Sequence, residues 1–440
     1  MFPSVSALIV VFGDLGRSPR MLNHARALRG RGWSVTLAGY NETELPPDLV
    51  SAAGTSRKDD SNLDPPAVRV VDLLTAGAAR PSSISLSTAL LRLLTELQRQ
   101  TWTAVIVQNP PGFPALAICA LATPPGAAIV LDWHNLGGTL LALRPSSRRR
   151  WAPLYSWCEA QAARFADFHW AVSAVLSRTL KPRTVTVVYD RPAKAFCAAA
   201  AEAAPSAEGE NRLTWWRRVL PDRPMPEGKF WIAAPSSWGP DEDHGAMLRA
   251  AECWKVNYQR WGDAPQITII ATGKGPGQAE FARAASAFDG GPVTLQTAWI
   301  PAKEYPAFLA HADAGLCLHR SSSGLDLPMK LADFRGARLP ALVLDYGPVL
   351  AETFQAGPDG WTFRNDKELA QALRPVAQSY GGSEAIRWSA TSGRAGPDRV
   401  LAAVTSSSSA ELAEHTTWED EWERQLGAWA ENLEARAACI

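Results

Sequence analysis

The chain has 440 residues, of which 46% are hydrophobic and 20% are charged, as in a folded protein with a substantial core. Its 44 basic side chains balance its 44 acidic ones, so the overall charge gives no attraction for nucleic acid, and we exclude that partner. One ordinary core does not organise a chain of this length, and we therefore expect two domains.

The six cysteines lie singly along the chain, without a CxxC pair. This pattern is typical of reduced, buried thiols in a cytosolic compartment and not of a disulfide framework or a zinc site. The apolar run at the start, Val5 to Phe12, is short and has no basic flank, so it does not predict a signal peptide. No stretch offers the roughly 18 uncharged apolar residues that a membrane span requires.

The first 194 residues alternate β-rich runs with helical patterns. Val5 to Phe12 is apolar without polar alternation, which is typical of a strand buried on both faces of a parallel sheet. Ser18 as N-cap and Pro19 at the first helical position predict a helix through about Arg31. Repeated units of this kind predict a doubly wound α/β sheet. Further strands are expected at residues 33–40, 68–73, 104–108, 127–131, 169–172 and 185–189.

Two loops at predicted strand ends carry candidate chemistry. Gly13-Asp14-Leu15-Gly16-Arg17 puts backbone amides, a carboxylate and a guanidinium at the carboxyl edge of the sheet, where open α/β folds bind ligands. It is not GxGxxG, and a plain capping loop fits it equally well. In Asp132-Trp133-His134-Asn135, His134 is the type of side chain most easily poised near neutral pH. A local or capping hydrogen bond is the alternative role for His134.

A basic and partly apolar segment follows. Arg144 and the three arginines 148–150 lie between the apolar run 140–143 and Trp151. Runs of charge usually form a solvated face. This mixture also suits contact with an anionic membrane surface or with a diphosphate.

The remaining chain is expected to form a linker, a second α/β domain and a last helix. Residues 195–228 begin aperiodic and end rich in proline, and we interpret them as a linker or insertion. The second domain, 229–410, ends in a Ser/Gly/Ala-rich surface insertion at about 380–410. The amphipathic pattern within 411–440 predicts a helix that packs back towards the first domain. Strands of the second domain are expected at 230–234, 266–271, 293–297, 314–318 and 340–344.

Loops of the second domain suit an anion. Gly273-Lys274-Gly275 is a glycine and lysine turn at a strand–helix junction, although it lacks the P-loop spacing. The stretch 321–330 gives a tight turn and, through Pro328, a predicted helix start that would attract a diphosphate. An ordinary strand–loop–helix junction is the alternative. Asp241-Glu242-Asp243 is interpreted as acids that cap a helix, in preference to a metal site.

Five segments, in the same order along the chain, resemble the chitobiosyl-diphospho-dolichol β-mannosyltransferases, over about residues 5–375. They are 13–21, 108–112, 132–135, 272–276 and 321–330. The resemblance implies a GT-B fold, with two Rossmann-like doubly wound domains facing across a cleft. It also implies inverting transfer of mannose from GDP-mannose to GlcNAc₂-diphospho-dolichol, which makes the β1,4-linked first mannose of the N-glycan precursor. The expected location is the cytosolic face of the endoplasmic reticulum membrane.

The resemblance also suggests roles for residues. Asp14 is the first candidate for the general base, and His134 is the second, with contact to the donor sugar as its other possible role. Asp333 takes the place of a carboxylate that binds the nucleotide ribose. No cofactor is expected beyond the donor substrate, and metal dependence is left open. The expected substrate- and nucleotide-binding residues are Gly13, Gly16, Arg17, Ser237, Gly273, Lys274, Gly275, Ser322, Ser323, Gly324, Leu325, Asp326, Lys330 and Asp333.

Two departures from the family and two alternatives accompany this interpretation. Family members usually carry an N-terminal membrane segment, whereas this chain starts almost at its first strand, so we expect peripheral attachment through surface features such as 140–151. Arg338 stands where glycine is common and is expected to crowd the loop behind the nucleotide site. One alternative is a GT-B transferase with another donor or a soluble acceptor. The other is an inactive GT-B protein that binds glycosyltransferases of the same pathway, against which intact Asp14 and Lys330 argue.

Overall fold

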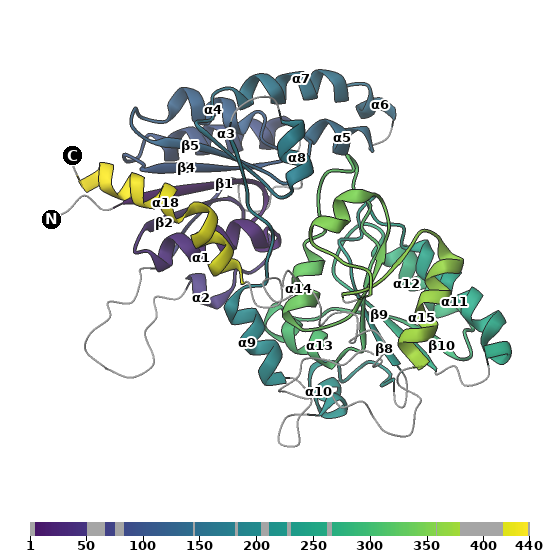
Figure 1. Ribbon diagram of the computed structural model, residues 1–440. Helices are drawn as coiled ribbons and strands as arrows, with labels where there is room; N and C mark the ends of the chain where they lie inside the picture. Colours follow the sequence, from purple (N-terminus) through teal and green to yellow (C-terminus); the bar gives the residue numbers. More distant parts are fainter. Residues whose placement is uncertain are drawn as a thin grey trace, which may run out of the picture. The chain divides into compact units, whose positions relative to one another are not determined.

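The chain forms two compact units in a computed structural model (Figure 1). The first unit comprises Met1–Asp190 and Trp418–Ile440, and the second comprises Arg191–Thr417. The structure describes residues 5–50, 67–74, 83–143, 146–180, 184–203, 211–226, 230–261, 266–357, 359–378 and 417–438.

The first unit is built on a parallel sheet of seven strands in the order β3-β2-β1-β4-β5-β6-β7. Its central strands are apolar and buried through their middle because helices cover both faces, and this confirms the predicted doubly wound sheet. The order reverses between β1 and β4, so ligands are expected to bind between the loops after these two strands, at the carboxyl edge. The strands are β1 Ser6–Asp14, β2 Ser34–Tyr40, β3 Arg69–Asp72, β4 Ala104–Asn109, β5 Ala128–Trp133, β6 Phe168–Ala171 and β7 Val185–Val187.

Helices and short 3₁₀ turns connect these strands. The first α-helix begins at Pro19, as predicted, but the hydroxyl of Ser18 donates to the carbonyl of Asp14 and accepts no N–H of the helix as a cap would. The elements are η1 Leu15–Arg17, α1 Pro19–Gly30, α2 Pro47–Val50, α3 Ser83–Leu97, α4 Ala115–Ala122, α5 Gly137–Ala142, α6 Ser146–Arg149, α7 Ala152–Ala163 and α8 Ala174–Thr179.

The last helix, α18 (Trp418–Ala438), belongs to the first unit although the whole second unit precedes it in sequence. Its apolar stripe joins the core formed by β1, β2 and α1. The charged side of α18 is also bound to the segment after α1, because Glu434 accepts from Arg31 at 2.9 Å and from the indole of Trp33 at 2.7 Å. The buried residues of this stripe include Trp418, Trp422, Leu426, Ala430 and Leu433.

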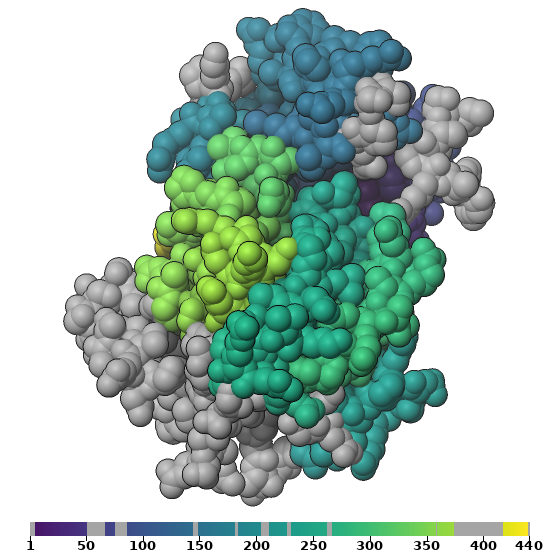
Figure 2. Space-filling model, turned by 90° about the vertical axis from the view of Figure 1, so that its right-hand side faces the viewer, coloured from purple at the N-terminus to yellow at the C-terminus, as the bar shows by residue number. Residues whose placement is uncertain are grey.

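The second unit has a parallel sheet of six strands in the order β10-β9-β8-β11-β12-β13. The order reverses between β8 and β11, which we call the switch point of this unit. On the surface in Figure 2, the teal residues of α11 lie against the yellow-green ones of α15, where Arg249 binds Asp366. The strands are β8 Phe230–Pro235, β9 Ile267–Thr272, β10 Val293–Ala298, β11 Ala314–Cys317, β12 Ala341–Leu344 and β13 Gly360–Phe363.

Helices complete the second unit, and in the described ranges none of the chain's helices is long and apolar enough to cross a membrane. The helices of this unit are α9 Lys194–Ala203, α10 Arg212–Val219, α11 Gly245–Asn257, η2 Tyr258–Trp261, α12 Gln278–Ala287, η3 Ala302–Glu304, α13 Tyr305–His311, α14 Lys330–Gly336, η4 Pro348–Glu352 and α15 Asp366–Gln378.

The interpretation of 195–228 as a linker or insertion is wrong for its described residues. This stretch contributes α9 and α10 to the second unit, and Trp215 and Trp216 of α10 are almost fully buried. Trp215 stacks on Phe308, and Trp216 meets Trp231 of β8 edge-on. The two tryptophans carry most of the apolar surface of a short helix, so no long periodic pattern marks it in the sequence. The insertion predicted at 380–410 lies outside the described residues.

Candidate functional site

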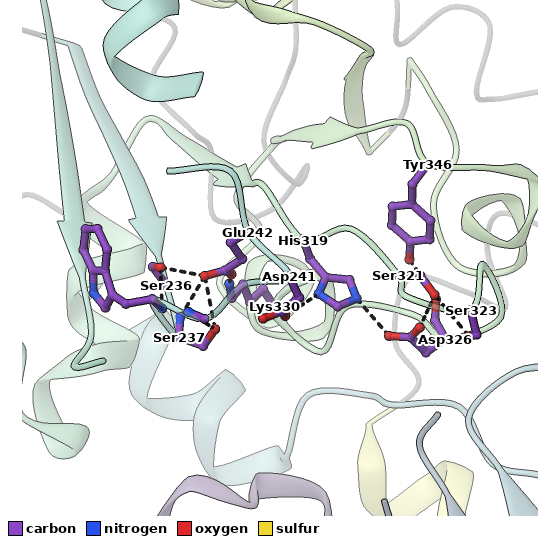
Figure 3. Close-up of polar contacts among 12 residues, drawn as sticks. Ser236, Ser237, Asp241, Glu242, His319, Ser321, Ser323, Asp326, Lys330 and Tyr346 are labelled. Carbon is purple, nitrogen blue, oxygen red and sulfur yellow. Dashed lines mark hydrogen bonds and ion pairs between the residues drawn. The ribbon is translucent and has the colours of Figure 1, made fainter. Parts of the chain in front are cut away.

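Polar side chains gather at the switch point of the second unit, where β8 and β11 end (Figure 3). Glu242, in the loop after β8, is their centre and is only 7% exposed. Its carboxylate accepts from the Ser236 hydroxyl at 2.6 Å and from the backbone N–H of Ser237 at 3.0 Å. The Lys330 ammonium forms an ion pair with the same carboxylate. Glu242 and Lys330 thus join the loop after β8 to the start of α14.

Lys330 is the first residue of α14, which begins two residues later than the helix start predicted at Pro328. Burial lowers the pKa of Lys330 to about 8, although Asp241 and Asp333 oppose the shift. The direct contact with Glu242 also favours the charged form. Lys330 is therefore a cation at neutral pH, held at the edge of the sheet where ligands bind.

His319 lies two residues after the end of β11. Its ring is held between two carboxylates. Its Nδ1 lies 3.3 Å from Asp241 Oδ2, and its Nε2 lies 2.8 Å from Asp326 Oδ2. Burial disfavours the charged ring, but the two carboxylates prevail and raise the pKa of His319 to about 9. His319 is thus an imidazolium at neutral pH and fixes the loops after β8 and β11 to each other.

The charge on His319 predicts a pH-dependent stability of the second unit. Its pKa is about 9 in the folded chain against 6.5 in the unfolded chain, so folding takes up a proton between these values. The stabilisation is fully present below pH 6.5 and disappears as the pH rises through 9. It amounts to about 3 kcal/mol.

We therefore expect the His319→Asn substitution to cost most at mildly acidic pH and much less above pH 9. Unfolding free energies of both proteins across this range measure the difference. A difference that does not change with pH would show that the His319 ring is neutral in the fold.

The loop from Ser321 to Asp326 is folded by its own side chains. The Ser321 hydroxyl donates to the Asp326 carboxylate and accepts the N–H of Gly324 at 2.8 Å. Gly324 has φ of 73°, a left-handed conformation in which a side chain is strained. The Tyr346 hydroxyl donates to the carbonyl of Asp326 at 2.8 Å. Asp326, expected to bind the nucleotide, thus braces the loop through its carboxylate and its carbonyl.

The glycine and lysine turn after β9 lies against the loop after β8. Gly273 has φ of 116°, and a Cβ atom there would stand 2.0 Å from the carbonyl of Ser236. Gly275 approaches the carbonyl of Ser237 as closely, at 2.1 Å. The Lys274 ammonium lies 4.0 Å from the centre of the Trp299 ring, a cation–π contact. The two glycines therefore bring Lys274 and Ser237 to the same edge of the sheet.

Three further residues that were expected to bind the nucleotide, and Arg338, have the following contacts in the structure. Asp333, proposed for the ribose, accepts from the Tyr305 hydroxyl at 3.3 Å. Ser323 accepts the N–H of Leu325 at 3.1 Å, and Ser322 lies in the same half-buried loop. Arg338 does not crowd this loop, because its side chain is exposed. It ends α14 in a left-handed conformation with φ of 54°, which explains why glycine also suits the position.

In the first unit, Asp14 ends β1 and is held by Thr43. The backbone N–H and the hydroxyl of Thr43 donate to the two carboxylate oxygens of Asp14, at 3.0 and 2.5 Å. Gly13 and Gly16 flank it, and Arg17 is exposed in the same loop. Asp14 is half-buried, and each of its oxygens has a second lone pair that a ligand can use.

His134 belongs to a network around Asp132, which is fully buried. Arg20 of α1 binds both Asp132 oxygens, at 2.8 and 3.0 Å, and His24 and His134 approach Oδ2 at 3.2 and 3.1 Å. Burial alone would raise the pKa of Asp132, but the Arg20 guanidinium and the His134 ring hold it well below its usual range. Asp132 is thus a carboxylate that only accepts hydrogen bonds.

The network fixes the protons of its two histidines. The indole N–H of Trp422 donates to His24 Nδ1 at 3.1 Å, so that nitrogen carries no proton and Nε2 donates to Asp132. Burial lowers the pKa of His24, which agrees with a neutral ring. His134 likewise donates from Nε2 to Asp132 and, when neutral, has its lone pair on Nδ1. His134 is partly exposed and can accept a proton there.

Sequence reasoning missed five residues that organise these sites, namely Glu242, His319, Tyr346, Arg20 and His24. The capping role given to Asp241-Glu242-Asp243 is wrong, because α11 begins later, at Gly245, and has no side-chain cap. The sequence signal that could have identified Glu242 as a site residue was the position of these acids in the loop after a strand. Within the described ranges no three His, Cys, Asp or Glu side chains are grouped to hold a metal ion, and metal dependence remains to be tested.

Comparisons with known proteins agree with this architecture. Residues 16–189 match the model of the glycosyl transferase 4-like domain family. A chitobiosyldiphosphodolichol beta-mannosyltransferase of Kluyveromyces lactis is 30% identical, over 83% of this chain and 81% of that protein. A UDP-glycosyltransferase of Arabidopsis thaliana is 28% identical, over 86% and 90%. Among solved structures, sucrose-phosphate synthase from Thermosynechococcus elongatus superposes with a TM-score of 0.60 at 13% identity, over 98% and 97%, and shares the fold.

Proposed function

Because the chain belongs to the chitobiosyldiphosphodolichol beta-mannosyltransferase family, we propose that it transfers mannose from GDP-mannose, with inversion, to GlcNAc₂-diphospho-dolichol. It is a glycosyltransferase with two Rossmann-like domains of the GT-B type. The relatives' substrate places its function at a membrane, and we assign it to the cytosolic face of the endoplasmic reticulum.

The observation that carries the proposal is the Lys330–Glu242 pair at the switch point of the second unit. A donor nucleotide sugar presents a diphosphate, and a partly buried cation at the carboxyl edge of the sheet suits that charge. Lys274 adds a second cation at the same edge. As the glycosidic bond to the phosphate breaks, these charges would stabilise the diphosphate that leaves.

Inverting transfer also needs a base that takes the proton of the acceptor hydroxyl as the new bond forms. Asp14 and His134 are the two candidates, and both lie at the carboxyl edge of the first sheet. Asp14 offers a carboxylate steadied by Thr43, and His134 offers the lone pair on Nδ1. We assign the base to Asp14 and keep His134 as the alternative.

The Asp14→Asn substitution is expected to lower turnover by about 10²- to 10⁴-fold, because the amide cannot take the proton. Donor affinity should stay unchanged, because the asparagine side chain has the same size and can still accept from Thr43. Turnover and donor titration measure the two quantities separately, with His134→Asn prepared in parallel. Full activity of the Asp14 variant together with an inactive His134 variant would move the base to His134.

The Arabidopsis relative makes a uridine nucleotide donor the second candidate. Incubation of the full chain with lipid-linked chitobiose and either GDP-mannose or a UDP-sugar separates the two. We expect transfer only from GDP-mannose, into a product that β-mannosidase cleaves. Transfer from a UDP-sugar alone would replace the first proposal with the second.

A further inference from the structure

The first unit exposes an apolar surface that the candidate sites do not use. We call it the α7 surface, and it comprises Leu143, Trp151, Leu154, Trp157 and Phe165. Their exposed fractions run from 43% to 62%. They are five of the twelve large hydrophobic side chains exposed in the described part of the chain, and all five fall within 23 residues. Such gathering on a soluble protein marks a surface that contacts a partner.

One side of the helix α7 packs against the protein, and the other side is exposed to solvent. Leu154 and Trp157 are three residues apart and share a face. The opposite face carries Glu159, Ala162 and Ala163, which are buried. Glu159 accepts the backbone N–H of Gly137 at 3.0 Å and so ties α7 to α5. The apolar face is therefore held rigidly and remains exposed to solvent.

The charge around this face is positive. Arg148–Arg150 are exposed at its start, Arg164 is exposed at its end, and the Arg150 guanidinium lies 5.8 Å from the Trp151 ring. The acid on α7, Glu159, points to the buried side. The exposed acid that follows, Asp167, accepts a backbone N–H from Ile129. A partner that binds this surface therefore needs an apolar region for the hydrophobic side chains and negatively charged groups for the arginines.

We propose that the α7 surface docks on an anionic phospholipid bilayer. Tryptophan rings settle at the boundary between acyl chains and headgroups, and arginines are drawn to lipid phosphates. Both kinds of side chain lie here within residues 148–164, on α7 and in the segments that flank it. The inference rests on the proposed function, because an acceptor with a dolichol tail presents its diphosphate at a membrane surface.

Sedimentation of the full chain with vesicles tests this inference. Vesicles of phosphatidylcholine with phosphatidylserine are expected to bind the protein, and vesicles of phosphatidylcholine alone much less. Trp151→Ser with Trp157→Ser should weaken binding by about tenfold or more, because apolar burial drives insertion. Each of Arg148–Arg150 changed to Gln should cost about fivefold, with the loss shrinking at high salt. These side chains are exposed, so thermal unfolding should not change.

Leu91→Ser and Val256→Ser serve as matched controls, because both side chains are more than 60% exposed and lie on other helices, α3 and α11. They should bind vesicles like the unmodified chain. The inference is overturned if the unmodified chain ignores anionic vesicles or if the tryptophan variant binds equally well. It is also overturned if the chain is a dimer in solution that the tryptophan substitutions split, since a second copy would then cover the surface.

Turnover with a short-chain, water-soluble acceptor separates this inference from the proposed function. That reaction needs no bilayer, so the tryptophan variant should keep it. Normal turnover without vesicle binding would contradict the docking surface and leave the proposed function standing. Vesicle binding that depends on the tryptophans, in a chain that transfers no mannose to any acceptor, supports the surface and counts against the proposed function.

Discussion

Replacing Lys330 with alanine is expected to weaken the binding of GDP-mannose by about 10- to 100-fold, because a hydrogen bond to a charged group contributes about 1.5–3 kcal/mol. Lys330 stands at the switch point with its charge directed by Glu242. Without it, Glu242 still accepts from Ser236 and Ser237, so the second unit should stay folded. Calorimetric titration with GDP-mannose gives the affinity, and thermal unfolding verifies the fold.

Lys255→Ala is the matched control for this experiment. Lys255 lies in the last turn of α11 and contacts the carbonyl of Asp289 and the ring of Phe288, not the switch point. The control should bind the donor like the unmodified chain. An unchanged affinity in the Lys330 variant would mean that the diphosphate binds elsewhere.

The second large effect concerns Asp132. Asp132→Asn is expected to destabilise the first unit by about 3–5 kcal/mol, the usual result of breaking a buried ion pair from one side. The Arg20 guanidinium, which is fully buried, would lose both charged contacts with Asp132 and would keep its contact with Asp190, at 2.9 Å. The amide keeps one acceptor oxygen but no negative charge, so the contact that fixes the His134 Nε2 proton should weaken and turnover should fall beyond the loss of folded protein.

A second Arg–Asp pair on the same helix provides the comparison. Arg26 of α1 binds Asp48 at 2.7 Å, but Asp48 is 54% exposed. Water screens this pair, so Asp48→Asn should cost less than about 1 kcal/mol. Chemical unfolding of the two variants measures both values. Equal losses would show that burial does not set the strength of the Arg20–Asp132 pair.

Patterns that repeat locally predicted the fold well. Short apolar runs such as those within β1 and β5 are typical of strands buried on both faces, and their alternation with helices predicts a doubly wound sheet. The short helix α10 escaped prediction because its apolar surface consists mainly of Trp215 and Trp216. Burial of those two rings depends on Trp231 of the next strand, β8, and on Phe308 of α13, which lies far along the chain.

Contacts between distant residues limited the prediction of the sites. The loops at strand ends were found because a parallel sheet brings its carboxyl ends together. Which partner each side chain takes was not readable, since Glu242 pairs with Lys330 across 88 residues and Arg20 pairs with Asp132 across 112. No local pattern encodes such pairs, and they decide the charge of each group.

The position of α18 in the sequence bears on the order in which the chain folds during its synthesis. The second unit is continuous and can complete its core as soon as it leaves the ribosome. The first unit is made earlier but finishes later, because Trp418 and Trp422, which cover Arg20 and His24, follow the whole second unit in the sequence. The histidine network of the first unit is therefore assembled only after the second unit has been synthesised, and nascent chains stopped before α18 should lack it.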